Sequence, residues 1–186
     1  MLARRPRPRV GGFYALRESK WKTVKQQDMF LPADLKGTFH VETVWWRFFR
    51  FFDDGSVRYA LVNEHEEKKP LDLALSLLRA DQPPSQRDSA SVGAGSSSHT
   101  TNKKKGPTSY IGDFALRPRF NLDVDVRLPH AKNRFEFHIQ HSDRGHFLRL
   151  KLLHFLQFIE NSMFDPIEHD LPKPPHFSFV PVPNWA

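Results

Sequence analysis

The pattern of hydrophobic positions is most distinctive between Val44 and Leu61, where aromatic and β-branched residues form two runs joined by Asp-Asp-Gly-Ser. Such residues favour strands, and Asp-Gly accepts the positive φ angles of tight hairpin turns, so the segment predicts a β-hairpin. Both alternating faces of the first strand are bulky. One face carries Val44, Trp46, Phe48 and Phe52, and the other carries Trp45, Phe49 and Phe51. We therefore expect both faces to be buried.

The rest of the chain shows further strands and one helix. We expect a short strand at 11–16, strands at 38–52 and 56–62, strands at 110–116, 122–126 and 134–140, and a proline-punctuated edge strand in 172–182. A Leu/Ala-rich run follows Pro70, which favours a helix of two to three turns within 64–80. Residues 147–164 fit either a strand or a buried helix.

This succession of elements predicts an all-β fold. Six or more strands with hairpin-length connections and one short helix argue for an antiparallel, barrel-like domain of the lipocalin-like kind. Closing the sheet into a barrel also leaves none of these aromatic-rich strands as an unpaired edge strand. One aromatic face of the hairpin would fill the lumen, and a helix or loop would cover the other.

Two segments lack any periodic apolar pattern. Residues 1–10 are rich in Arg and Pro, and residues 81–106 are dominated by Ser, Gly, Pro and Thr. We expect a disordered basic leader at 1–10 and a disordered low-complexity insertion at 81–106. A single barrel-like domain then spans 11–182, interrupted by the insertion. The prolines of the leader oppose the amphipathic helix of a mitochondrial presequence.

Charge and cysteine content exclude several classes of protein. The formal net charge is +7, but residues 1–10 contribute +4 and residues 81–105 contribute +2, so the body is nearly neutral. Nucleic-acid binding by the folded part is therefore not expected. No cysteine occurs, which rules out disulfides, thiol catalysis and thiolate metal sites. With no apolar stretch long enough for a membrane span, we expect a protein of the cytoplasm or the nucleus.

The polar residues nominate no catalytic or metal site. His138, His141 and His146 are close in sequence, but alternation along a strand separates the first two, and two ligands do not make a zinc site. Asp123 and Asp125 share one strand face, which we interpret as a solvated face. Nucleophile-elbow and phosphate-binding glycine motifs are absent from the sequence. We expect a protein that is not an enzyme and that has no cofactor.

Two arginines stand out within the aromatic hairpin. Arg47 and Arg50 are three residues apart, so they point to opposite faces of the strand. A guanidinium among aromatic side chains must pair with a carboxylate or stack on rings, because it keeps its charge. Either the arginines make internal ion pairs and stacks, or one of them recognises a ligand or peptide. Trp46, Arg47 and Arg50 are the candidate contacts with a partner.

The same hairpin resembles a known family. Residues 45–55, Trp-Trp-Arg-Phe-Phe-Arg-Phe-Phe-Asp-Asp-Gly, are similar to a motif in the C-terminal domain of the F-box-only-protein-nine type, the substrate receptors of SCF ubiquitin ligases. Four further segments occur in the same order as in the family: Gly12–Tyr14 before the motif, and the helix at 66–78, residues 111–116 and residues 177–182 after it. The resemblance therefore covers about 11–182. The Leu31–Leu35 segment resembles the opening of an F-box, but the aromatic hairpin follows it, so we reject that reading.

The resemblance implies a non-catalytic domain that holds target proteins for ubiquitination. The family's F-box and tetratricopeptide-like repeats are not seen in this sequence, so binding to SCF subunits is expected only if an F-box is supplied elsewhere. The alternative is a lipocalin-like barrel that carries a small apolar ligand, which requires an enclosed cavity of at least about 300 Å³. A third possibility, phosphate or RNA binding through Lys103–Lys105 and the leader, predicts a steep salt dependence.

Overall fold

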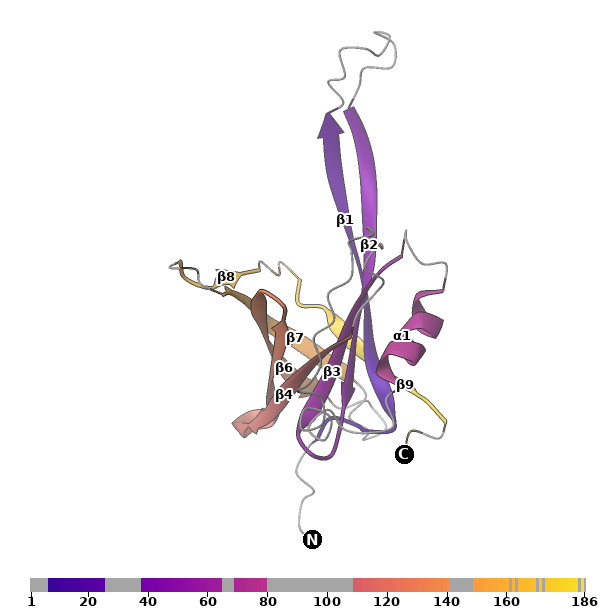
Figure 1. Cartoon of the computed structure of the whole chain (residues 1–186), viewed down its shortest axis with the longest axis vertical. Coiled ribbons are helices and arrows are strands. Elements are labelled where there is room, and N and C mark those ends of the chain that lie inside the picture. Colours follow the sequence, from indigo (N-terminus) through magenta and orange to yellow (C-terminus); the bar gives the residue numbers. More distant parts are fainter. Residues whose placement is uncertain are drawn as a thin grey trace, which may run out of the picture.

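The chain forms a closed antiparallel β-barrel with a short helix on its outside (Figure 1). The computed structural model describes residues 7–25, 38–64, 69–79, 109–140, 149–160, 162, 164–169, 171, 173–183 and 185, without the side chains at 22–25 and 38–41. The elements are β1 (Gly12–Lys25), β2 (Thr38–Phe51), β3 (Ser56–Asn63), α1 (Pro70–Leu78), β4 (Ser109–Arg117), the 3₁₀ turn Pro118–Phe120, β5 (Asn121–Leu128), β6 (Ala131–Gln140), β7 (Arg149–Ile159), β8 (Ile167–Glu168) and β9 (His176–Pro181).

Eight strands close the barrel in an up-and-down order. Each strand from β1 to β7 pairs with the next in the sequence, and β9 pairs with both β7 and β1. The two-residue β8 is an extra strand beside β7. The prediction of an antiparallel, barrel-like fold with one short helix is therefore confirmed. The expected edge position of the C-terminal strand is wrong, because β9 is the strand that closes the ring.

The lumen of the barrel is filled by aromatic and aliphatic side chains. Phe49 lies at its centre, with ring centroids 5.1 Å from Phe135, 5.4 Å from Phe137 and 5.3 Å from Phe177. Alternate residues of the strands point inward, as expected for a barrel. The buried members of this cluster are Tyr14, Phe49, Phe51, Val57, Tyr59, Leu122, Val124, Val126, Phe135, Phe137, Ile139, Leu150, Leu152, Phe155 and Phe177.

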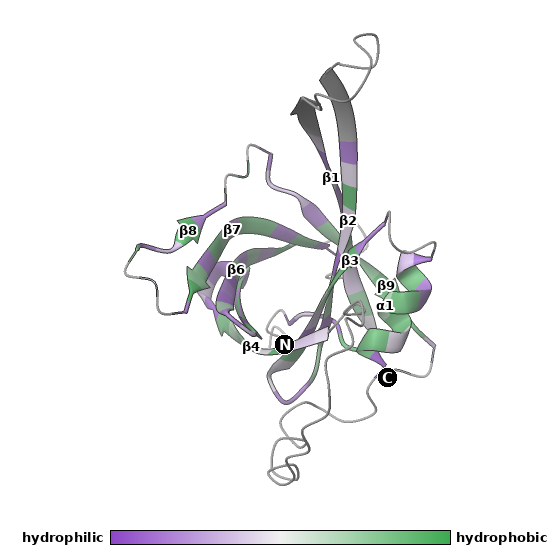
Figure 2. Cartoon of the chain, turned by 45° about the horizontal axis from the view of Figure 1, so that its top comes forward, coloured by the Kyte–Doolittle hydropathy of each residue, from purple (hydrophilic) through white to green (hydrophobic). Residues whose placement is uncertain are grey.

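A second, smaller core lies between the barrel wall and α1, which sits outside β2 and β3 (Figures 1 and 2). Ala74 and Leu78 of the helix are buried against Phe13, Phe48 and Val62. The helix begins with Pro70, as its sequence predicts. Both faces of β2 are thus covered, Phe49 and Phe51 by the lumen and Phe48 by α1, as expected from the aromatic run. Trp46, however, is only partly buried.

The segment with two possible readings, 147–164, contains a strand. β7 carries an irregularity where Leu152 pairs with Phe137 and His154 pairs with Glu136, so Leu153 is an extra residue. The buried positions change from Leu150 and Leu152 to Phe155 across this bulge. A bulge moves inward-facing positions by one residue. It therefore explains why apolar residues occur in both alternating sets of this segment.

Several expectations fall at or beyond the edges of the described residues. Residues 7–10, expected to be disordered, belong to the described structure and contact the barrel: Pro8 is buried, and the Arg9 backbone N–H donates to the Tyr14 hydroxyl at 2.9 Å. The described part of the domain therefore starts before residue 11. Residues 1–6, the insertion at 81–106 and Leu31–Leu35 lie outside the described residues. Within the described part, no helix is long and apolar enough to cross a membrane.

Candidate functional site

The three residues nominated from the sequence lie in three different places. Arg47 reaches one mouth of the lumen, where it contacts Tyr59 and Phe155 of the inner core. Arg50 lies on the outside at the end of α1, and Trp46 lies near the start of α1. The structure does not bring them together into one site.

Arg47 holds a polar cluster at the lumen mouth. Its Nε donates to the Glu18 carboxylate at 2.5 Å, and one of its terminal nitrogens donates to the Tyr59 hydroxyl at 3.0 Å. Trp45 Nε1 donates to the same Glu18 oxygen at 2.6 Å. The guanidinium also lies over the ring of Phe155, 5.0 Å from its centroid. Arg47 therefore has the internal ion pair and the aromatic stack that its sequence context requires.

The surroundings fix the charge states in this cluster. Burial by itself would lower the pKa of Arg47, but Tyr59 and Glu18 outweigh it and hold the pKa above its ordinary value. Burial raises the pKa of the Tyr59 hydroxyl, so it stays neutral and accepts the bond from Arg47. His169 stacks on Phe155 with centroids 4.1 Å apart. Its pKa is lowered by burial and then by Arg47, which favours the uncharged imidazole.

Arg50 stabilises the end of the helix. One of its terminal nitrogens donates to the Leu78 carbonyl at 2.7 Å, in the last turn of α1. Its guanidinium lies 4.6 Å from the ring centroid of Phe52 and 4.0 Å from that of Trp185. A cation at a helix C-terminus satisfies a carbonyl and complements the helix dipole. Arg50 thus anchors α1 to the barrel.

Trp46 forms one wall of a shallow groove beside the start of α1. Its indole Nε1 donates to Glu64 at 2.9 Å, and Glu64 also accepts two hydrogen bonds from Arg17. The groove has a volume of about 280 Å³, and its other walls are Lys69, Pro70, Leu71 and Asp72. Trp46 also stacks on Phe48, with centroids 5.9 Å apart. The indole is therefore partly exposed at the wall of this groove.

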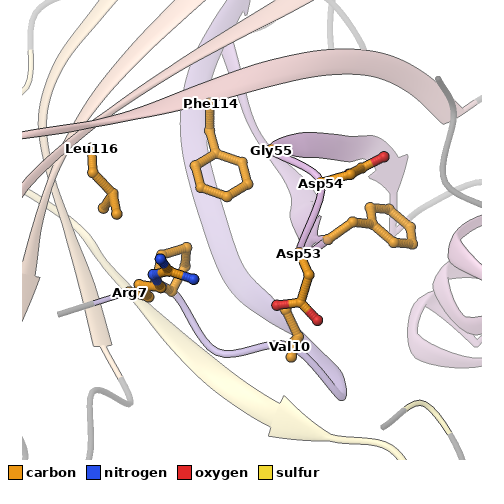
Figure 3. Close-up of a pocket in the computed structure, with 9 residues that line it drawn as sticks. Arg7, Val10, Asp53, Asp54, Gly55, Phe114 and Leu116 are labelled. Atoms are coloured by element: carbon orange, nitrogen blue, oxygen red, sulfur yellow. The ribbon is translucent and has the colours of Figure 1, made fainter. Parts of the chain in front are cut away.

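The opposite end of the barrel holds a second pocket, of about 290 Å³ (Figure 3). Phe114 and Leu116 of β4 line one side, and Arg7 and Val10 of the N-terminal segment lie across from them. The β2–β3 turn completes the wall. Asp54 points away from the pocket centre in Figure 3 and accepts hydrogen bonds from the backbone and hydroxyl of Ser56. The pocket is open at the barrel end and lies outside the packed lumen.

Tyr14 at this end gives a testable pH dependence. Burial raises its pKa to about 12, from an ordinary value near 10. Because the folded-state pKa is the higher one, the contribution of Tyr14 to stability is complete below pH 10 and is lost as the pH rises from 10 to 12. The free energy of unfolding should fall by about 1.4 kcal/mol per pH unit in this window. Urea unfolding of the wild type and of Tyr14→Phe checks this, and equal slopes for both proteins would contradict it.

The fold also contains a two-stranded ribbon that the sequence did not indicate. β1 and β2 pair from Tyr14 with Phe49 out to Lys25 with Thr38. β9 pairs with β1 only as far as Ala15, and β3 pairs with β2 only from Trp45 onward. The outer halves of β1 and β2 therefore project beyond the barrel (Figure 1). Trp21 on this ribbon is 63% exposed.

The other polar groups considered from the sequence are accounted for by local contacts. Asp125 accepts hydrogen bonds from Arg134 and pairs with Lys132, and Asp123 pairs with Arg117. These are partly or fully exposed ion pairs on the outer face, as the alternation predicts. His138 bonds Asn121, while His141 and His146 lie outside the described residues. Among the residues with described positions, no cluster of side chains could hold a metal ion.

Fold and surface together define the class of protein: an eight-stranded, up-and-down β-barrel with a packed lumen, an outer helix and a projecting ribbon. Comparison with known proteins adds no closer relationship. No family model, no curated protein and no solved structure matches the chain.

Proposed function

We propose that this barrel is a non-catalytic protein-interaction domain that holds target proteins for ubiquitination by an SCF ligase. The observation that carries the proposal is the packed lumen. Phe49, Phe135 and Phe137 occupy the space in which a carrier would place its ligand. Recognition is thereby left to the outer surface, where the ribbon and the groove beside Trp46 are accessible.

The ligase context of the proposal comes from the resemblance in residues 45–55. Within that motif, Arg47 and Arg50 are engaged by groups of this domain, Glu18 and the Leu78 carbonyl. The motif therefore builds the barrel mouth and anchors the helix. Its two arginines support a shared fold with the receptor domains, and target selection would use the ribbon and the groove beside Trp46.

The carrier alternative ranks second because of where the pockets lie. The pocket of about 290 Å³ at the barrel end is slightly smaller than the roughly 300–1,000 Å³ of typical ligand sites. It is bordered by the β2–β3 turn and by residues 7–10, and it opens to solvent. A small apolar ligand bound there would be only partly enclosed.

Proximity labelling in cells tests the proposal. The full chain carrying a labelling enzyme is expressed while the proteasome is inhibited, and the labelled proteins are compared with those labelled by a Phe49→Ala variant, in which the barrel core is broken. We expect the SCF adaptor subunit and ubiquitin-conjugated proteins to be enriched by the wild type. If neither group exceeds the variant's level, the ligase role is wrong.

A further inference from the structure

The outer edge of β1 is an open strand edge. β9 covers β1 only from Gly12 to Ala15, so from Leu16 to Lys25 the strand is paired on one side alone, with β2, within the described part of the chain. An open edge carries a row of N–H and C=O groups that can pair with another extended chain. In Figure 1 this edge runs along the ribbon and away from the barrel.

The register shows which residues direct their backbone groups outward. The Gly11 carbonyl accepts a hydrogen bond from the Val182 N–H, on the β9 side. Backbone directions alternate along an antiparallel strand. Odd-numbered residues of β1 therefore face away from β2, and even-numbered residues face toward it. The five residues whose N–H and C=O groups line the open edge are Arg17, Ser19, Trp21, Thr23 and Lys25.

Charge selects the kind of chain that fits this edge. The segment contains lysines at positions 20, 22 and 25, while its Arg17 and Glu18 are already paired with Glu64 and Arg47. Two copies of this chain pairing through β1 would bring these lysines together, and like charges opposite one another destabilise a strand pair. An acidic strand would instead gain opposite-charge pairs.

We propose that the outer edge of β1, from Arg17 to Lys25, binds an extended acidic segment of a partner protein as an added strand. The backbone groups of the odd-numbered residues hold the segment, and the exposed indole of Trp21 packs on its side chains. The inference rests on the proposed function in that the partner is the target protein. It names the chemistry by which that target is recognised.

A pair of proline substitutions at one level of the ribbon tests the proposal. Thr23 and His40 are direct partners, and each directs its N–H toward its own outer edge. Thr23→Pro blocks the β1 edge, and His40→Pro blocks the β2 edge. Neither removes a hydrogen bond between the two strands, and proline is tolerated at such edge positions. Far-ultraviolet circular dichroism and melting temperature verify that both variants fold, and Ser19→Pro is a second variant for the β1 edge.

The probe is a labelled ten-residue peptide of alternating Glu and Val, with a Lys/Val peptide as its control, and binding is measured by fluorescence anisotropy. We expect the full chain to bind the acidic peptide and not the basic one. Thr23→Pro should weaken binding about tenfold, the effect of losing one or two hydrogen bonds, while His40→Pro leaves it unchanged. Binding should also weaken several-fold from about 0.05 M to about 0.5 M salt, because the contacts are exposed.

Four outcomes would overturn the inference: no binding of the acidic peptide up to about 1 mM, equal binding of both peptides, equal effects of the two prolines, or self-association that Thr23→Pro abolishes. The labelling experiment is independent of these outcomes. If ubiquitin-conjugated proteins are enriched but the peptide does not bind, only the β1 edge is wrong. If the peptide binds without such enrichment, the edge stands and the ligase role is wrong.

Discussion

Replacing Phe49 with alanine is expected to lower the free energy of unfolding by about 3–5 kcal/mol, the range for truncating a buried aromatic side chain. Phe49 is fully buried at the centre of the lumen. Its ring meets those of Phe135, Phe137 and Phe177 edge-on, at centroid distances of 5.1–5.4 Å. Truncation therefore removes several favourable ring contacts together with the buried area. Chemical denaturation at neutral pH measures the loss.

Ile111→Ala provides the matched control for this measurement. Ile111 also lies on a barrel strand, but it is 40% exposed and points outward. Its truncation should change the free energy of unfolding by at most about 0.5 kcal/mol. If Phe49→Ala proved as mild as Ile111→Ala, the lumen would not be packed as described. The carrier reading would then gain support.

The main features of the fold could be predicted from local pattern. In β5 and β6 the alternation of Val124 and Phe135 with charged residues sets which face enters the lumen. The Leu/Ala run after Pro70 formed the expected helix. The bulky residues on both faces of β2 indicated that a second layer covers the barrel wall, and α1 is that layer. These features depend on residues close together in sequence, so a pattern can show them.

Long-range features were the ones the sequence did not show. The prolines around β9 suggested an edge strand. However, Pro181 lies opposite Gly12 at a position where the two strands exchange no backbone hydrogen bond, so the missing N–H of proline is not needed. The next hydrogen bond between the strands runs from the Val182 N–H to the Gly11 carbonyl. The ribbon forms because β1 and β2 extend further than the strands paired on their other sides. The alternation of residues within one strand does not indicate that difference in length. Arg47 pairs with Glu18, and Arg50 donates to the Leu78 carbonyl at the end of α1. Both partners are far from the arginines in the sequence, so the hairpin alone could not identify them.

Arg47→Met is expected to lower the free energy of unfolding by about 3 kcal/mol, the lower end of the range for breaking a buried ion pair. The side chains of Arg47 and Glu18 are only 14% and 20% exposed. Removing the guanidinium leaves the Glu18 carboxylate with Trp45 as a donor and removes the bond to the Tyr59 hydroxyl. The remaining indole donor keeps the loss from being larger. Urea unfolding measures it.

A double-mutant cycle separates the ion pair from the packing of the arginine stem. Glu18→Gln in the Arg47→Met background removes the uncompensated charge, so the double variant should be more stable than Arg47→Met alone. The matched control is Arg17→Met, whose pair with Glu64 is 48% and 36% exposed, so that its loss should change stability far less. Equal losses for Arg17→Met and Arg47→Met would contradict the burial of the pair. In that case Arg47 would be available to a partner, and recognition at the lumen mouth would replace its structural role.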